Sequence, residues 1–184
     1  MDQKFLALLK EIINQQEIQP TDIPMIDLYM DQVITLFESK LCEAKRNDED
    51  KLLTKTVINN YVKDKILMPA KNKKYTPEHL IMMIFIYNLK QILSINDIKL
   101  LFTETVYKEE IDIFKLYERF IEIKKQDQRQ TEQIILEKLE GFNPDQSHKI
   151  DIMMMVLSLV STANIQKRLA EKIIDTYLLP SVEK

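Results

Sequence analysis

A run of lysines and asparagines between Lys51 and Tyr75 holds the side chains best suited to contact a polyanion. This segment contains seven lysines and one acid, Asp64, for a net charge of +6, whereas the whole chain of 184 residues has a formal charge of −3. Lysine ammonium groups neutralise phosphates, and asparagine amides can pair with adenine edges in the major groove. The uneven charge predicts a nucleic-acid-binding surface, although lysines often serve only to solvate an exposed helix.

The spacing of apolar residues predicts that a helix and a basic turn present these side chains. Thr54 is suited to open the helix as its N-cap, and Pro69 prevents the helix from continuing. The residues expected to face the interior are Val57, Ile58, Tyr61 and Ile66. Lysines follow Pro69 in the turn, and then Thr76 and Pro77 start the next helix. The polar residues of the first helix are therefore expected to face a partner.

The segment from Thr54 to Phe102 resembles the winged helix-turn-helix of MerR-type transcription regulators. In that family a helix opened by Ser or Thr ends in an aromatic residue, a leucine pair and a proline, and a short wing and two helices follow. The positions that fit this order are Thr54, Ile58, Tyr61, Ile66, Leu67 and Pro69, with Ser94 to Ile98 as the closing turn and last helix. The resemblance implies that Lys73 and Tyr75, in the wing, contact the DNA backbone.

Three positions depart from the pattern of the regulators. Asn59 stands where the family usually has a DNA-contacting arginine, Lys65 replaces a helix-ending glycine, and the wing is short and has no glycine. The residues predicted to bind DNA are Thr54, Lys55, Thr56, Asn59, Asn60, Tyr61, Lys63, Lys71, Lys73, Lys74 and Tyr75. The whole chain also resembles an uncharacterised family of Gram-positive bacterial proteins of unknown function, in segments such as DLYMDQV and TKTVINNYVKDK.

Composition and periodicity predict an all-α helical bundle. The sequence has a single glycine, Gly141, and apolar residues recur at helical spacing along most of its length. We expect about six or seven helices and at most one short β-hairpin, between Met68 and Tyr75. Residues 1–103 are expected to form the N-terminal helices with the winged helix-turn-helix-like domain, and residues 104–184 a C-terminal helical domain for dimerisation or sensing.

Three helical segments outside the motif bear on this organisation. Residues 27 to about 45 are predicted as the helix that supports the recognition helix. Residues 124–133 lack an apolar stripe, so they form either the solvated part of one continuous helix or the break between two helices. The last helix, predicted from about residue 145 to 179, is expected to insert its apolar residues into a core or a partner. These are Ile152, Met153, Val156, Leu157, Leu159 and Val160.

The sequence offers little for catalysis or for a cofactor. Nucleotide-binding turns need several glycines, and we found no motif that assembles a nucleophile, a base and an orienting group. His79 is expected to be a surface or capping residue, His148 has no metal-ligand partner nearby in sequence, and Cys42 is expected to be a buried structural thiol. We therefore expect a protein that is not an enzyme and that has no metal or organic cofactor.

The location predicted from the sequence is cytoplasmic. The longest apolar run, Leu80 to Tyr87, is too short to span a bilayer, and no basic-then-apolar signal opens the chain.

Two functions fit these observations. The first is a DNA-binding transcription regulator in which residues 27–102 read double-stranded DNA and residues beyond Val106 form a homodimer, with any small-molecule effector unknown. The second is a helical protein–protein interaction module that keeps the fold without binding DNA, and Asn59 in place of the arginine favours it.

Overall fold

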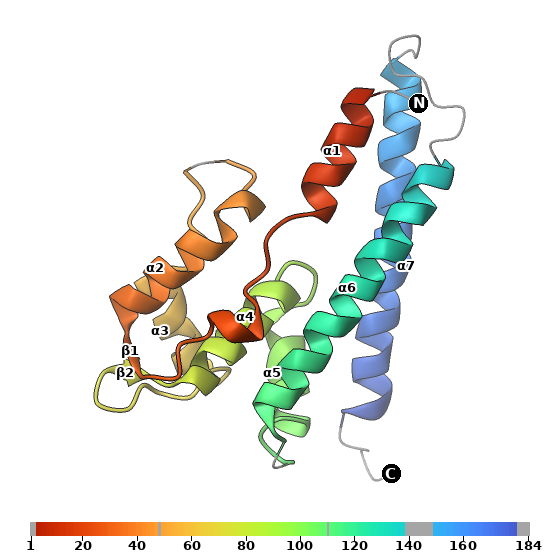
Figure 1. Ribbon diagram of the computed structural model, residues 1–184. Coiled ribbons are helices and arrows are strands. Elements are labelled where there is room, and N and C mark those ends of the chain that lie inside the picture. The colour runs from red at the N-terminus through yellow and green to blue at the C-terminus, as the bar shows by residue number, and fades with distance from the viewer. Residues whose placement is uncertain (1–2, 48, 110, 139–148, 180–184) are drawn as a thin grey trace, which may run out of the picture.

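The structure is a computed structural model that describes residues 3–47, 49–109, 111–138 and 149–179 (Figure 1). Its helices and strands are, in chain order, α1 (Gln3–Ile13), β1 (Leu28–Tyr29), α2 (Met30–Leu41), α3 (Lys55–Lys63), β2 (Lys74–Tyr75), α4 (Pro77–Leu89), α5 (Ile95–Glu104), α6 (Ile113–Lys138) and α7 (Lys149–Tyr177). Short 3-10 turns, η1 (Pro20–Asp22) and η2 (Cys42–Ala44), complete the regular structure of the described residues. The prediction of an all-α protein with about six or seven helices is confirmed.

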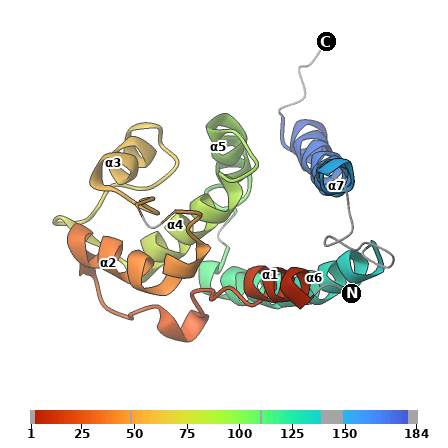
Figure 2. The ribbon, with the colours of Figure 1, turned by 90° about the horizontal axis from the view of Figure 1, so that it is seen from above.

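Helix α4 is the centre of the core. Every residue from His79 to Ile86 is buried, because other helices surround this helix on all sides. Figure 2 shows α4 in the middle, with α2, α3, α5 and α6 around it. The neighbours contribute fully buried side chains such as Phe37 from α2, Ile58 from α3 and Tyr117 from α6. This packing fixes the position of α3 on the molecule.

One prediction is corrected at the start of α2. Residues 28 and 29 were expected in a helix beginning at Asp27, but Leu28–Tyr29 forms strand β1 and the helix begins at Met30. Leu28 pairs with Tyr75 and Tyr29 with Lys74, in an antiparallel register. Tyr29, the last residue of the strand, is also the N-cap of α2, and its amide donates a hydrogen bond to the Gln32 side-chain oxygen at 2.8 Å. A strand therefore exists outside the Met68–Tyr75 segment.

The C-terminal half consists of two long helices. Residues 124–133 belong to α6, which is continuous over its 26 residues, so the polar stretch is the solvated part of one helix. The first half of α6 packs on the N-terminal helices, and Ile113, Tyr117 and Ile121 join their hydrophobic core. Helix α7 contacts α5 and buries only Ile174. The domain boundary predicted at residue 103 stays a prediction.

The predicted burial of the first half of α7 does not occur within one chain. Side chains such as Ile152, Met153 and Val156 are about half exposed or more. None of the described helices combines the length and the apolar character that crossing a bilayer requires.

Candidate nucleic-acid interface

Helix α3 separates a buried face from a polar face. The Thr54 side chain accepts a hydrogen bond from the Val57 amide at 3.2 Å, which confirms Thr54 as the N-cap. Ile58 and Tyr61 point into the core. The solvent-exposed face consists of Lys55, Thr56, Asn59, Asn60 and Lys63. This face contains two cations, two amides, a hydroxyl and no carboxylate.

Lys65 ends α3 in the backbone conformation that glycine usually adopts. Its φ angle is +60°, and the amides of Lys65 and Ile66 donate to the carbonyls of Val62 and Tyr61 at 3.1 and 2.9 Å. This arrangement satisfies the last carbonyls of the helix and turns the chain back toward the core. A left-handed φ costs a residue with a Cβ roughly 1–2 kcal/mol. The sequence therefore tolerates strain here that a glycine would remove.

The basic turn after α3, residues 71–75, is the predicted wing, and it is a tight hairpin. The amides and carbonyls of Lys71 and Lys74 exchange two hydrogen bonds, of 3.0 and 2.9 Å. The two residues between them, Asn72 and Lys73, have φ angles of +50° and +64°. Positive φ at both central positions is the signature of a type I′ turn, for which Asn-Gly is the favoured sequence. The short hairpin predicted between Met68 and Tyr75 is confirmed.

Strand β2 fastens the wing to the body of the protein. Its pairing with β1 places the Lys74 ammonium 5.1 Å from the centre of the Tyr29 ring. Tyr75 is buried, and its ring meets the edge of His79 at a centroid distance of 5.7 Å. The turn itself stays in solvent, with Lys71, Asn72 and Lys73 exposed. Three polar side chains of the turn can thus contact a partner while its base is held in place.

His79 has a structural role at the start of α4. Its Nδ1 atom accepts a hydrogen bond from the Thr76 amide at 3.2 Å and lies 2.8 Å from the Thr76 hydroxyl oxygen. Burial lowers the pKa of His79, because the charged ring would lose its hydration. The capping role predicted for this histidine is present, but the residue is buried rather than on the surface. Within the described residues, no group of three or more His, Cys, Asp or Glu side chains is arranged to hold a metal ion.

Most of the predicted binding residues share the exposed surface, but two do not. Tyr61 is 6% exposed and Tyr75 is 4% exposed, so both rings belong to the core and are not available to a partner. Tyr75 was assigned by resemblance. Tyr61 was also expected from the helical spacing to face the interior, and that expectation is confirmed. Thr54 is half buried and acts as the helix cap. Cys42, predicted to be buried, is exposed on η2.

The surface formed by the other predicted residues we name the α3–wing surface. It consists of Lys55, Thr56, Asn59, Asn60, Lys63, Lys71, Lys73 and Lys74. Figures 1 and 2 both place α3 and the wing at the end of the molecule opposite α7. Asn72, which is exposed in the middle of the turn, was noted in the basic turn but was not included among the residues predicted to bind DNA. The signal was available, because asparagine is favoured at the first central position of a type I′ turn.

Among the described residues, three carboxylates lie at the edge of the α3–wing surface. Asp64 is exposed directly after α3. The pKa of Glu78 is lowered by a hydrogen bond from Thr76 and, to a smaller extent, by the charge of Lys71. Asp31 on α2 forms a 2.7 Å ion pair with Lys55, and both side chains are largely exposed, at 76% and 61%. Ion pairs this exposed contribute little to stability and exchange readily for other charges. Lys55 is therefore the lysine whose charge is least free for an external anion.

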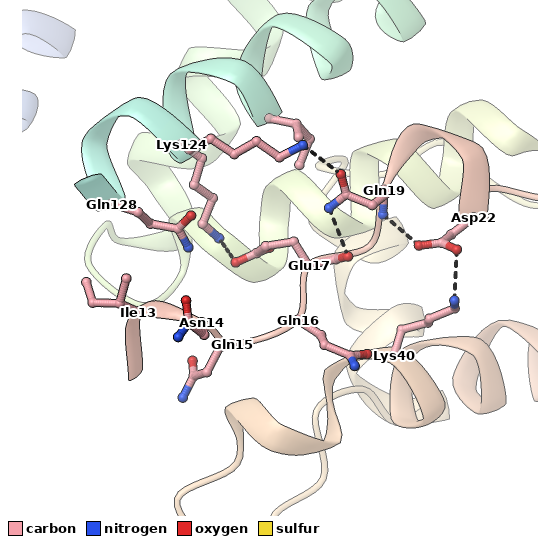
Figure 3. Close-up of a pocket in the computed structure, with 12 residues that line it drawn as sticks. Ile13, Asn14, Gln15, Gln16, Glu17, Gln19, Asp22, Lys40, Lys124 and Gln128 are labelled. Carbon is pink, nitrogen blue, oxygen red and sulfur yellow. Dashed lines mark hydrogen bonds and ion pairs between the residues drawn. The ribbon is translucent and has the colours of Figure 1, made fainter. Parts of the chain in front are cut away.

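A second candidate, a polar cavity of about 390 Å³, lies between the end of α1, η1 and α6. Figure 3 shows Lys124 directed at Glu17, and Lys40 at Asp22. Lys125 donates to the Gln19 side chain at 3.1 Å. The hydrogen bond from Lys40 and that from the Gln19 amide lower the pKa of Asp22. Since the charged side chains of the network pair with one another or with Gln19, the network holds η1 and the residues before it against α2 and α6.

Comparison with known proteins identifies the family of this chain. Residues 18–120, which run from before η1 into the first third of α6, match a family described as a domain of unknown function (DUF1836). Neither the curated proteins nor the solved structures contain a significant match. Because the matched segment covers more than half of the sequence and contains the whole α3–wing surface, the chain belongs to the DUF1836 family.

Proposed function

We propose that this protein is a cytoplasmic, DNA-binding transcription regulator that contacts double-stranded DNA through the α3–wing surface. The observation that carries the proposal is the exposed polar face of α3, with two lysines and two asparagines, next to a hydrogen-bonded turn bearing three lysines. The order of capped helix, wing and two further helices resembles MerR-type regulators, and transcription regulation is proposed on that likeness. No metal or cofactor is required for this function.

The dimensions of the surface suit a duplex. An α-helix with its side chains is about 10–12 Å in diameter, and the major groove is about 12 Å wide, so a helix such as α3 fits the groove. Asn59 and Asn60 lie on the exposed face, where amides can pair with adenine. In this arrangement Lys71 and Lys73 reach neighbouring phosphates from the wing. The lysines position the protein, and the asparagines read the sequence.

A protein–protein interaction module is the second candidate function. The Lys55–Asp31 ion pair favours it, because it shows that an acidic group can satisfy this surface, and so does Asn59 in the place of an arginine. In this reading, the α3–wing surface binds an acidic protein. The two functions predict opposite results with bare duplex DNA.

Fluorescence anisotropy with a labelled duplex of mixed sequence tests the proposal. We expect binding at about 50 mM salt, with affinity falling steeply as salt rises, because each phosphate contact contributes about −0.9 to the slope of log K against log salt. The double variant Lys71→Gln, Lys73→Gln should reduce that slope by about 1.8. The matched control, Lys10→Gln with Lys99→Gln, removes two exposed lysines elsewhere and should leave the slope unchanged. Absence of binding at low salt would refute DNA binding and favour the interaction module.

A further inference from the structure

Helix α7 exposes apolar side chains that its own chain does not cover. Of its 29 residues only Ile174 is buried, although the helix is rich in large apolar residues. Those that are exposed are Ile150, Ile152, Met153, Met154, Val156, Leu157, Val160, Ile165, Leu169, Ile173 and Tyr177. A contiguous apolar surface of this extent on a folded chain marks an interaction site.

Apolar side chains cover more than half of the circumference of the first half of α7. At about 100° per residue, an arc of roughly 200° around the helix axis is occupied by Ile150, Ile152, Met153, Met154 and Val156. The polar side chains of Asp151 and Thr162 lie in the remaining part of the circumference. The apolar arc is wider than the stripe of about 100° that a surface helix typically turns to its core. One neighbouring groove covers only one face of a helix. The rest of the apolar arc therefore needs a second surface to bury it.

The molecule carries a groove of suitable character between α4, α5 and α6. It has a volume of about 480 Å³ and is lined mainly by apolar residues, including Leu101, Phe120 and Ile123. Its lining also includes Arg119, and two further polar residues, Asn88 and Thr105, already donate to the carbonyls of Ile84 and Leu101, at 2.9 and 2.7 Å. The groove therefore suits apolar side chains better than a polar ligand.

We infer that a second copy of this chain covers α7, and that α7 of each copy lies in the α4–α5–α6 groove of the other. The two long helices match in length, since α6 and α7 have 26 and 29 residues and so extend for about 39 and 44 Å. Such pairing would join α6 and α7 of both copies into a four-helix arrangement about a two-fold axis. This inference does not depend on DNA binding.

The accessible area supports a second copy as the occupant. The whole chain exposes 13,231 Å², whereas a compact protein of 21.9 kDa exposes about 9,300 Å². The difference, about 3,900 Å² over all segments of the chain, is large enough to include the roughly 800 Å² that each partner contributes to a standard interface. Closure of α7 onto the groove of its own chain would cover one side of the apolar arc and leave the other side in water. A second copy supplies both its groove and its own α7, which together can cover both sides.

Light scattering of the full chain without DNA gives the first test. At about 10 μM protein we expect twice the mass of 21.9 kDa. The variant Val156→Glu, Val160→Glu should shift the protein to the monomer mass with unchanged helical circular dichroism. The matched control Met25→Glu, Met68→Glu changes two exposed apolar residues away from α7 and should remain dimeric. A monomer mass for the unaltered chain at 100 μM, or a dimer that survives both glutamates, would overturn the inference.

Disulfide cross-linking distinguishes a second copy from closure within one chain. In a Cys42→Ser background, one chain carries Ile123→Cys in the groove. A tagged chain carries Met153→Cys, Val156→Cys or Val160→Cys on α7. When the two chains are mixed and oxidised, we expect a disulfide between tagged and untagged chains for at least one α7 position. A disulfide that forms only within a chain carrying both cysteines would show that α7 occupies its own groove, and no cross-link at any position would exclude the groove as the site.

Discussion

Replacing Lys73 with glycine should stabilise the protein and weaken its binding to DNA. Lys73 occupies the second central position of the type I′ turn with φ of +64°, where glycine carries no steric penalty. The strain amounts to roughly 1–2 kcal/mol, and the greater freedom of glycine in the unfolded chain offsets part of the gain. We expect a net increase of about 0.5–1 kcal/mol in the free energy of unfolding, and hence a rise of about 1–4 °C in Tm for a chain of this size.

The same substitution removes one ammonium group from the proposed phosphate contacts. The slope of log K against log salt should fall in magnitude by about 0.9. If the two proteins bind equally well at about 1 M salt, this difference in slope gives a loss of affinity of roughly 15-fold at 50 mM salt and about 4-fold at 200 mM. A residue present only to shape the turn would not produce this salt-dependent loss. Lysine at a position that favours glycine is thus an outlier for which binding offers an explanation.

Lys65→Gly is the matched control. Lys65 has nearly the same φ, +60°, but it caps α3 and lies outside the α3–wing surface. This variant should gain similar stability and keep the DNA affinity and salt slope of the unaltered protein. Urea unfolding and anisotropy at 50, 100 and 200 mM salt measure both quantities. If Lys73→Gly keeps an unchanged salt slope, the wing does not contact phosphate, and if it lowers stability, the account of the turn is wrong.

Three further predictions address base reading, pH dependence and the core. The double variant Asn59→Ala, Asn60→Ala should weaken sequence preference by about 1–3 kcal/mol per lost base contact and leave the salt slope nearly unchanged. Selection from a duplex library measures the preference, and an equal preference before and after would exclude these amides as base-reading groups. The hydrogen bonds from Lys40 and the Gln19 amide lower the pKa of Asp22 in the folded protein. The stabilisation from this carboxylate is therefore complete above the unfolded pKa of about 3.9, and it disappears as pH falls through the lower folded pKa. Lys40→Met should therefore cost stability at pH 7 and little at pH 2, by urea unfolding, and an equal cost at both pH values would contradict this assignment. Tyr117→Phe should lower the free energy of unfolding by about 1–3 kcal/mol, because it leaves the buried Ile18 carbonyl without its donor. A loss below about 0.5 kcal/mol in urea unfolding would show that the Tyr117–Ile18 hydrogen bond contributes little.

Local sequence signals predicted those parts of the fold that depend on neighbouring residues. Thr54 as a cap and the hairpin at Lys71 to Lys74 follow from capping and turn chemistry within a few positions. The end of α3 was wrongly expected near Pro69, because the helix stops at Lys63, before the left-handed turn at Lys65. The all-α class follows from periodicity and the scarcity of glycine. For the same reason the exposed polar face of α3 could be predicted residue by residue.

Features that depend on distant segments were not predictable in this way. Strand β1 exists because Leu28 meets Tyr75, which lies far along the chain, and two residues are too few to show an alternating pattern. Tyr75 was placed at the interface by resemblance, but its ring lies in the core. Tyr61 was assigned to both the interior and the interface, and the structure confirms the interior position that the helical spacing predicted. The apolar residues of α7 indicate burial without showing whether the cover is the same chain or another.

Two tyrosines link distant parts of the matched family segment. The Tyr117 hydroxyl donates to the carbonyl of Ile18, and the Tyr107 hydroxyl donates to that of Ile66 at 2.7 Å. Both tyrosines and both carbonyls lie within residues 18–120, so these bonds join its first residues and the end of α3 to the α5–α6 region. A fragment cut at residue 103 would lose both donors together with the α6 side of the core, and should not melt as one transition. A fragment of residues 18–120 keeps them and is the shorter piece that should unfold cooperatively.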